Sequence, residues 1–385
     1  MHVCNLTESY PSRFEAKYNK FALHKGTSLH NDSKKLIEKG VDVSVITSKV
    51  KNEPDFEIFE NVNVYRVKKK GLYPFLFVYR MFKKIKEIDK KRKIDIVHGT
   101  WAGFAGLAAV IYSKLYKKKS VITIPGNDVC YSKEYKYGAY RHWFLRPMVR
   151  YILKNADKLT ALSPYLADFM NNLWKIKREA VIIPLSVGDE YLKNVKKFKF
   201  DKELKILTVA RTIKRKRVSD IIRALNLLKK DNIKFKFYIV GSNGDEYEEI
   251  VKLIEEYNLR ENVIFTGAMT NKDVIKYYDM CDIFILTSVA EGFGNVFLEA
   301  LSRRKPIIMS SETGCSRILK NKVHAIIIKP LMPDKIYESI KLLVNDKKLA
   351  GKIAENGYKL VRENYTYDKR ADKLINIYKN LILTH

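Results

Sequence analysis

Short runs of β-branched residues alternate with amphipathic stretches along the whole chain, and this alternation constrains the fold more than any other feature of the sequence. It is typical of βαβ units, in which helices join parallel strands and cover both faces of the sheet. The pattern continues to about residue 190 and starts again near residue 204. The sequence therefore predicts an α/β protein with two Rossmann-like domains, each a doubly wound parallel sheet.

Thirteen of the apolar runs have the length and composition of buried strands, seven before the restart and six after it. The runs in the first half are HVCNL (2–6), VDVSVIT (41–47), VNVYRV (62–67), IDIVHG (94–99), SVITIP (120–125), KLTALS (158–163) and AVIIP (180–184). Those in the second half are LKILTVA (204–210), FKFYIVG (235–241), NVIFTG (262–267), DIFILTS (282–288), PIIMS (306–310) and HAIIIK (324–329).

The domain boundaries follow from the restart, since 385 residues suit two domains of about 100 to 200 residues each. We expect an N-terminal domain over residues 1–190 and a C-terminal domain over 204–365. The polar, Lys-rich stretch 189–203 lacks periodicity and is interpreted as the linker. Ligands of open parallel sheets bind beyond the C-terminal ends of the strands, so we expect a ligand cleft between the domains.

The net charge of +30, from 73 Lys and Arg against 43 Asp and Glu, favours an anionic partner. Both halves of the chain are basic, so no single tail carries the excess. Such a field attracts nucleic acids, anionic lipid surfaces and phosphorylated substrates. A compositional bias toward Lys, Asn, Ile and Tyr, the residues of A/T-rich codons, explains the average charge equally well.

Cysteine usage and hydropathy indicate a cytoplasmic protein. The four cysteines, at positions 4, 130, 281 and 315, form neither a C-x-x-C pair nor a zinc-ligand spacing, which fits a reducing compartment. No secretory signal is visible at the N-terminus. The longest uncharged apolar run, 101–112, is too short to span a bilayer. We expect no transmembrane segment.

The segment 286–308, LTSVAEGFGNVFLEALSRRKPII, carries the strongest chemical signal. It leaves a buried strand, passes through a glycine loop and enters a helix, with Glu291 on the loop and Glu299 on the helix. Backbone N–H groups at a helix N-terminus bind phosphate, and carboxylates accept hydrogen bonds from vicinal hydroxyls. This arrangement predicts a nucleotide-sugar pocket; the alternative is a glycine turn followed by a helix with a solvated Glu.

The same segment resembles the E-x7-E motif of the retaining GT-B glycosyltransferases of family 4, through EGFG at 291–294, LEA at 298–300 and KP at 305–306. The resemblance implies a GT-B fold, two Rossmann-like domains facing across a cleft. It also implies transfer of a sugar from a UDP- or GDP-linked donor to an acceptor hydroxyl. Glu291 would contact hydroxyls of the transferred sugar. The residues that it assigns to donor binding are Glu299, Gly292, Phe293, Gly294 and Asn295.

A second stretch, ARTIKRKRVSDIIRAL from residue 210, resembles the family segment G-R-L-x-x-x-K-G. By this resemblance Arg211 and Lys216 clamp the donor diphosphate and act in catalysis, although Ala210 and Arg217 replace the two glycines. A guanidinium and an ammonium offset the charge of a leaving diphosphate without a metal ion. The alternative is that KRKR (214–217) forms a solvated or nucleic-acid-binding patch.

The first half of the chain matches the family less closely. A single glycine, Gly26, stands where the family has a Gly-Gly loop, and Pro125 replaces the His of the H-G-x-D turn. Asp128 is then the best-placed catalytic residue of that turn. His98 resembles the His of the D-x-V-H segment, although a structural role fits it equally well. Gly26 and His98 are the expected acceptor-side residues.

The resemblance also predicts where the C-terminal helix lies. In the family, a terminal helix such as the one expected over 366–385 crosses back onto the first domain.

Residues 66–93 contain twelve Lys and Arg around an aromatic and aliphatic block. Such a segment suits an anionic membrane surface, which favours a lipid-linked or glycan acceptor and a peripheral location on the inner face. A core helix with a basic exposed face is the alternative.

Absent motifs narrow the function further. The sequence contains no Asp-x-Asp, which argues against a metal-dependent GT-A enzyme, and no G-x-x-x-x-G-K-[ST] loop. We therefore expect no metal and no cofactor, with the nucleotide sugar entering as substrate. Two alternatives remain: a GT-B epimerase or hydrolase without an acceptor, and a basic nucleic-acid-binding protein. No recognisable nucleic-acid-binding motif is present, so no specific nucleic acid is expected.

Overall fold

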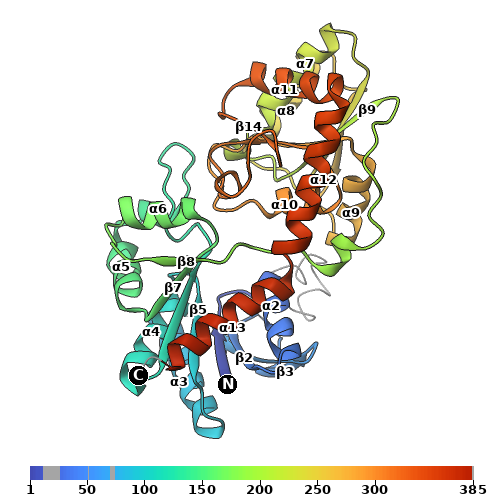
Figure 1. The fold of residues 1–385 in the computed structure, drawn as a ribbon. Coiled ribbons are helices and arrows are strands. Elements are labelled where there is room, and N and C mark those ends of the chain that lie inside the picture. Colours follow the sequence, from blue (N-terminus) through green and yellow to red (C-terminus); the bar gives the residue numbers. More distant parts are fainter. Residues whose placement is uncertain (12–26, 51, 70–73, 384–385) are drawn as a thin grey trace. The chain divides into compact units, whose positions relative to one another are not determined.

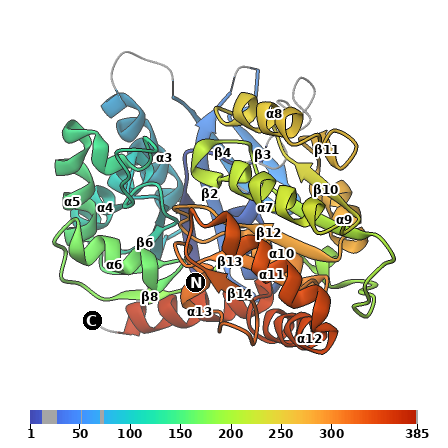
Figure 2. The same ribbon diagram turned by 90° about the horizontal axis from the view of Figure 1, so that it is seen from above.

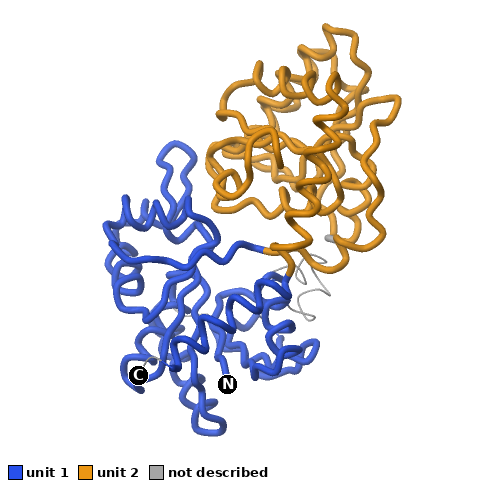
Figure 3. The backbone as a smooth tube through the Cα atoms, viewed as in Figure 1, with its two compact units in different colours: residues 1–185, 367–385 blue, residues 186–366 orange. Residues whose placement is uncertain are grey.

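The computed structural model describes residues 1–11, 27–50, 52–69 and 74–383, and these form two compact units (Figure 3). Unit 1 consists of Met1–Leu185 and Tyr367–His385, and unit 2 of Ser186–Thr366. The chain therefore passes between the units twice, after residue 185 and after residue 366.

Unit 1 is built on an eight-stranded sheet in the described part of the chain, with the strand order β3-β4-β2-β1-β5-β6-β7-β8. All neighbouring strands are parallel except β3, which pairs antiparallel with β4. The strands are β1 (His2–Leu6), β2 (Asp42–Lys49), β3 (Phe56–Phe59), β4 (Val62–Lys68), β5 (Ile96–Thr100), β6 (Lys119–Ile124), β7 (Lys158–Ala161) and β8 (Ala180–Ile182).

Helices cover both faces of this sheet (Figures 1 and 2). The helices are α2 (Thr27–Glu38), α3 (Pro74–Lys91), α4 (Phe104–Tyr116), α5 (Arg146–Asn155), α6 (Pro164–Asn172) and α13 (Tyr367–Leu383), with 3-10 turns η2 (Ala139–Arg141) and η3 (Trp143–Leu145). Leu36 of α2 and Leu374 of α13 share one core cluster with Val43 and Val64 of the sheet. On the opposite face α4 packs so closely on β5 that a Cβ on Gly99 would lie 2.9 Å from the Cα of Gly106.

The apolar run 101–112 is therefore accounted for by a buried helix. It gives rise to most of α4, whose alanines are buried against the sheet. Among the described residues, no helix is both long and apolar enough to cross a membrane. The four cysteines are buried as free thiols.

Unit 2 contains a fully parallel sheet with the order β11-β10-β9-β12-β13-β14 among the described residues. Its strands are β9 (Leu204–Val209), β10 (Phe235–Val240), β11 (Val263–Gly267), β12 (Ile283–Leu286), β13 (Ile307–Ser310) and β14 (Ile326–Ile328). Its helices are α7 (Val218–Lys230), α8 (Tyr247–Glu256), α9 (Asn271–Met280), α10 (Asn295–Ser302), α11 (Pro333–Asn345) and α12 (Lys347–Asn364), with η4 (Asp189–Leu192), η5 (Lys214–Lys216) and η6 (Cys315–Arg317).

Alternation along β12 shows why this sheet is doubly wound. Ile283 and Ile285 belong to the core cluster that includes helices α7, α8 and α11. Phe284, between them, points to the other face, where its ring centroid lies 5.7 Å from that of Tyr278 on α9 and 5.9 Å from that of Phe297 on α10. Because successive strand residues point to opposite faces, a run apolar at every position is buried on both sides.

All thirteen expected strands are present, and β3 is the strand that the sequence did not predict. It lies at the edge of the sheet and is partly exposed to solvent, with Ile58 61% exposed. Because such a strand is not buried on both faces, its short sequence FEIF does not form a fully apolar run. The turn into β4 uses Glu60 and Asn61, both with positive φ. This pair lacks the Asn-Gly or Asp-Gly that marks a tight hairpin in a sequence.

The stretch 189–203, expected as a linker, belongs to unit 2 instead. Tyr191 is buried, and the buried guanidinium of Arg303 donates to the backbone oxygens of Tyr191 at 3.1 Å and Lys193 at 2.6 Å. Phe198 and Phe200 pack on the core of the unit. The sequence pattern did not indicate this role, because the contacts to Arg303 are made by backbone carbonyls, which do not affect the periodicity of the side chains.

The terminal helix α13 is fastened to unit 1 by a buried ion pair. Arg370 Nε lies 2.8 and 2.9 Å from the two carboxylate oxygens of Asp32 on α2. Its Nη1 donates to the backbone oxygens of Ile183 at 2.7 Å and Pro184 at 2.6 Å, just before the chain enters unit 2. The guanidinium thus joins three segments that are distant in the sequence.

We expect Asp32→Ala to destabilise unit 1 by about 3–5 kcal/mol, because it leaves the Arg370 charge buried and unpaired. Urea unfolding followed by tryptophan fluorescence measures this, since the three tryptophans, at 101, 143 and 174, all belong to unit 1. Lys373→Ala, at an exposed position of α13, is the control and should change stability by less than about 0.5 kcal/mol. Equal unfolding midpoints for the two variants would contradict the prediction.

Candidate active site

The carboxyl ends of β9, β12 and β13 lie side by side in unit 2, and the loops that follow them are joined backbone to backbone. Val289 N–H donates to Arg215 O at 3.0 Å, which links the loop after β12 to the turn after β9. Glu291 N–H donates to Glu312 O at 3.0 Å, and Gly314 N–H donates to Glu291 O at 2.9 Å, which links it to the loop after β13. The Glu291 backbone is therefore fixed on both sides.

The Glu291 carboxylate accepts two cations from the turn after β9. Lys216 Nζ and Arg215 Nη1 both bind its Oε2 atom, Arg215 at 3.1 Å. Arg215 Nη1 also donates to the backbone oxygen of Ala290. Within the described residues Glu291 Oε1 has no hydrogen-bond partner. One carboxylate oxygen thus organises the site while the other can accept a hydrogen bond from a ligand.

Charge and burial together determine the ionisation of this pair. Burial acts to raise the pKa of Glu291, but the charges of Lys216 and Arg215 outweigh burial and hold the pKa below its ordinary value. Burial lowers the pKa of Lys216, Glu291 opposes that shift, and Arg215 and Arg211 lower the pKa further. Glu291 is consequently a carboxylate at neutral pH.

The rest of the KRKR run is tied into unit 2 and does not form a continuous solvated patch. Arg217 Nη2 pairs with Asp220 at 2.6 Å, and Lys214 is exposed. Arg211, just before this run, is exposed and forms no ion pair with any described residue. Of the two cations expected to clamp a diphosphate, Lys216 is therefore held by Glu291, whereas Arg211 is accessible.

The glycine loop forms the start of α10. Gly294 is its N-cap residue with φ of 91°, and no side chain caps the helix. A Cβ at this position would lie 2.7 Å from the Phe297 ring. Only glycine fits both the left-handed backbone and the close ring. The first amides of α10 have no side-chain cap, which is the arrangement that binds anions and polar ligands.

Glu299 and Asn295 form a second polar group one turn into α10. Tyr278 OH donates to Glu299 Oε2 at 2.9 Å, and Asn295 Nδ2 donates to Glu299 Oε1 at 2.8 Å. Asn295 Oδ1 is buried without a hydrogen-bond partner among the described residues. Burial raises the pKa of Glu299, with the two donors acting in the opposite direction. This group retains acceptor capacity for ligand hydroxyls.

The remaining predicted residues belong to unit 1. Asp128 is buried and accepts hydrogen bonds from Gly126 N–H at 3.0 Å and Ala102 N–H at 2.9 Å, which joins the loops after β5 and β6. Burial raises the pKa of Asp128 to about 6, although these backbone amides oppose the shift. Gly26 lies outside the described residues.

His98 has both ring nitrogens engaged inside unit 1. Nδ1 lies 2.7 Å from Tyr378 OH on α13, and Nε2 lies 2.7 Å from Thr123 Oγ1 on β6. Burial and then the Arg370 charge lower the pKa of His98 to about 3, so the imidazole is neutral. This environment favours the structural role over contact with an acceptor.

Two residues of the site escaped sequence reasoning. In the sequence Arg215 is only one member of a basic run, because the residue that it binds, Glu291, is 76 positions away. Tyr278 lies on α9 in no recognisable motif, and its hydroxyl reaches Glu299 only because α9 and α10 share a face of the sheet. No group of three or more His, Cys, Asp or Glu side chains suited to a metal ion occurs among the described residues.

We expect His98→Gln to flatten the pH dependence of unit 1 stability. Between pH 6.5 and about 3 the unfolded chain binds a proton at His98 that the folded unit excludes, so stability falls as the pH falls. The slope from this group is about 1.4 kcal/mol per pH unit. Tryptophan-detected urea unfolding at several pH values measures it. An unchanged pH dependence in the folded variant would contradict the enclosed, neutral imidazole.

Comparison with known proteins places the chain in a family. Residues 191–360 match the family described as Glycosyl transferases group 1, and residues 26–190 match that described as Glycosyltransferase Family 4. The chain is 26% identical to an uncharacterized glycosyltransferase of Methanocaldococcus jannaschii, with 98% of both chains covered. It is 24% identical to alpha-monoglucosyldiacylglycerol synthase of Streptococcus pneumoniae, over 77% of this chain and 70% of that protein.

A third relative is the N,N'-diacetylbacillosaminyl-diphospho-undecaprenol alpha-1,3-N-acetylgalactosaminyltransferase of Campylobacter jejuni, 25% identical over 83% of this chain and 86% of that protein. Among solved structures, sucrose-phosphate synthase from Thermosynechococcus elongatus superposes with a TM-score of 0.78 at 19% identity, covering 100% of both chains. The Anabaena protein HepE in complex with UDP gives a TM-score of 0.75 at 15% identity, covering 99% of this chain and 100% of that chain. The chain therefore belongs to the group 1 glycosyltransferases with a family 4 N-terminal domain, and it has the GT-B fold.

Proposed function

We propose that this glycosyltransferase is a retaining, metal-independent enzyme that moves a sugar from a UDP- or GDP-linked donor to a hydroxyl of a lipid-linked or membrane glycan acceptor. The observation that carries the donor half of the proposal is the Glu291 carboxylate held between Lys216 and Arg215 at the strand ends. Next to it lie an uncapped helix start and the Glu299–Asn295 group.

The donor diphosphate would bind to Arg211, Lys216 and the first amides of α10. These groups are positive or partly positive, and they belong to two loops that the backbone holds together. As the bond between the sugar and the phosphate breaks, negative charge grows on the leaving diphosphate. Fixed cations and amides stabilise that charge without reorganising, which is the usual source of the largest rate effect.

The two carboxylates would have separate tasks. Glu291 Oε1, on the ionised carboxylate, would accept a hydrogen bond from a hydroxyl of the transferred sugar. Glu299 and the Asn295 Oδ1 atom would accept hydrogen bonds from the ribose hydroxyls. A buried amide oxygen without a partner is costly in the free protein, so a hydroxyl that satisfies it would add to donor affinity.

The proposed reaction keeps the configuration of the sugar through an oxocarbenium-like transition state. The bond from the anomeric carbon to the phosphate oxygen breaks and a bond to the acceptor oxygen forms on the same face. The acceptor proton passes to the leaving diphosphate, so no protein nucleophile is needed. Asp128, with both oxygens bound to amides, would act by shaping the loop after β6.

The acceptor half of the proposal rests on α3 and on two relatives whose names include lipid groups, a diacylglycerol and a diphospho-undecaprenol. The apolar stripe of α3, which includes Phe77 and Met81, is buried. Phe75 is 66% exposed and Tyr79 59% exposed, beside several lysines. Aromatic side chains among lysines suit an anionic interface, which would place the enzyme on the cytoplasmic face of a membrane.

We expect one UDP- or GDP-sugar to bind the purified protein with equal affinity in the presence and absence of EDTA. Isothermal calorimetry and thermal shift measure this, because a ligand that binds only the folded state raises its stability. Transfer to an acceptor with retained anomeric configuration, read by NMR, completes the test. Inverted product, or strict dependence on a divalent cation, would contradict the mechanism. Turnover of the donor without an acceptor would favour an epimerase or hydrolase.

Lys216→Ala is expected to lower kcat by about 100-fold or more, because it removes a charge that stabilises the leaving diphosphate. Glu291→Ala should have a comparable effect and also release the two cations. Lys214→Ala is the matched control, since this exposed lysine lies in the same turn and carries the same charge. Wild-type turnover in purified, folded Lys216→Ala or Glu291→Ala would refute the assignment.

A further inference from the structure

The helices α3, α4 and α5 lie side by side on one face of the unit 1 sheet (Figures 1 and 2). Phe82 of α3 packs against Tyr112 of α4, with ring centroids 5.3 Å apart. Ile152 of α5 packs against α4 near Gly106, where an added Cβ would lie 3.5 Å from Ile152 Cγ2. The three helices therefore form one layer, on the opposite face of the sheet from α2 and α13.

Two exposed aromatic residues lie just before α5, in the 3-10 turn η3. Trp143 is 77% exposed and Phe144 60% exposed, and their ring centroids lie 6.3 Å apart. The centroid of the His142 ring lies 5.7 Å from that of Phe144, and the same ring accepts a hydrogen bond from Arg141 Nε at 2.8 Å. These four side chains, which we call the η3 cluster, are thus linked by direct contacts, with two aromatic rings at one end and a cation at the other.

Contacts with the interior of unit 1 hold this turn in place. The Arg146 guanidinium lies 4.1 Å from the centroid of the Tyr140 ring, and its Nε donates to Tyr140 O at 2.8 Å. The Tyr140 ring in turn meets the fully buried Trp174 edge to face, with centroids 4.9 Å apart. The turn that displays the η3 cluster is therefore fixed on the core.

Helix α5 continues the exposed surface of η3. Leu145 and Arg146 both have right-handed helical backbone, so the chain runs from η3 into α5 without a break. The exposed residues of α5 are Pro147, Arg150, Tyr151 and Lys154. At about 100° per residue they fall on one side of the helix, opposite the buried Val149, Ile152 and Leu153. The same spacing, continued backward, places residues 143 and 144 on that side as well.

This exposed strip is basic and lies in a segment without acidic residues. Residues 139–155 include four Lys and Arg and no Asp or Glu. The side chains of Arg150 and Lys154 are exposed and form no ion pair with any described residue. A second copy of this chain, docked through the same strip about a two-fold axis, would bring like charges together. The strip therefore favours an anionic partner over self-association.

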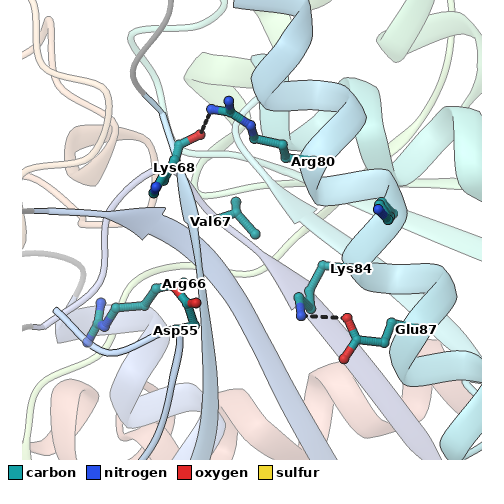
Figure 4. A pocket seen from close by; sticks show the side chains of 8 residues that line it. Asp55, Arg66, Val67, Lys68, Arg80, Lys84 and Glu87 are labelled. Atoms are coloured by element: carbon teal, nitrogen blue, oxygen red, sulfur yellow. Dashed lines mark hydrogen bonds and ion pairs between the residues drawn. The ribbon is translucent and has the colours of Figure 1, made fainter.

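The cations beside α3 differ, because some of them are engaged within unit 1. Figure 4 shows Arg80 Nη1 donating to Lys68 O at 2.8 Å and Lys84 Nζ paired with Glu87 at 2.5 Å, beside a cavity of about 340 Å³ between β4 and α3. The Arg80 contact fastens α3 to the end of β4. Part of the charge on α3 therefore serves the fold, whereas the exposed cations of α5 form no ion pair with described residues.

We propose that the η3 cluster docks unit 1 on an anionic membrane, with Trp143 and Phe144 inserted among the lipid headgroups. Tryptophan concentrates at membrane interfaces, and nearby Lys and Arg are attracted to anionic headgroups. Single-stranded nucleic acid stacks successive bases on aromatic faces, which the angle of 90° between the two rings disfavours. The inference deepens the membrane partner of the proposed function and rests on it for the location of the acceptor.

Tryptophan fluorescence tests the insertion directly. The probes are vesicles of phosphatidylcholine and phosphatidylglycerol, with and without bromine on the acyl chains. Binding should shift the emission of the wild-type protein to shorter wavelength, and the brominated lipid should quench it. Trp143→Phe should still bind but lose the quenching, because the other two tryptophans, at 101 and 174, are less exposed. Absence of quenching in the wild-type protein, or its persistence in Trp143→Phe, would overturn the proposal.

Cosedimentation with the same vesicles measures the affinity. Trp143→Ala/Phe144→Ala should lower it by about 10-fold or more, at low and at high salt, because the variant loses its apolar contact with the bilayer. Arg150→Ala/Lys154→Ala should lower the affinity mainly at low salt, since salt screens the attraction between these cations and the headgroups.

The matched control is Leu331→Ala/Met332→Ala. These two residues are also exposed and apolar, but they belong to unit 2 and lie outside the helix layer. The control should bind the vesicles as the wild-type protein does. Equal affinities of this control and Trp143→Ala/Phe144→Ala would overturn the proposal. Thermal-shift midpoints equal to that of the wild-type protein show that the variants fold.

Further arms separate this proposal from other partners and from the proposed function. An oligonucleotide whose binding is lost in Trp143→Ala/Phe144→Ala, while vesicle binding is kept, would assign the cluster to nucleic acid and overturn the membrane. Nucleotide-sugar binding, measured by calorimetry, should be unchanged in every variant. Donor binding without vesicle binding overturns the docking surface alone, whereas vesicle binding through Trp143 without donor binding overturns the proposed function alone.

Discussion

The ion pair between Glu291 and the cations of Lys216 and Arg215 is the interaction on which the proposed donor site depends. A carboxylate with this little exposure would be costly to bury unpaired, so its partners must be in place whenever the loop after β12 is folded. Those partners come from the turn after β9, about 75 residues earlier. They meet because β9 and β12 are adjacent and parallel, so their carboxyl ends lie at one edge of the sheet.

The same topology separates structural charge from charge that can bind a ligand. In the KRKR run Arg217 is engaged by Asp220, while Arg211 before the run is accessible. In unit 1 the Arg66 guanidinium forms an ion pair with Glu57, while the exposed Lys68 and Lys83 form no ion pair with described residues. The net charge of +30 therefore does not by itself identify a binding site, because the fold pairs some of these cations with carboxylates and leaves others without one among the described residues.

Much of the fold could be read from local pattern, and the exceptions have physical causes. Buried parallel strands are apolar at nearly every position, so all thirteen were found, whereas β3 is a half-solvated edge strand. The stretch 189–203 looked like a linker because its contacts to Arg303 are made by backbone oxygens. Its two phenylalanines, Phe198 and Phe200, were the signal that could have placed it on a core.

By itself the sequence determined the two doubly wound sheets and the loops at which their strands end, since period and glycine placement are local properties. It also supplied Glu291, Glu299 and Lys216 as candidates. Only the tertiary structure decided that Arg215 binds Glu291, that His98 is enclosed by Tyr378 and Thr123, and that Lys68 and Lys83 line one cavity. Those facts depend on which strands and helices become neighbours. Side-chain identity does not encode the distance between residues separated by dozens of positions, because long-range packing sets that distance.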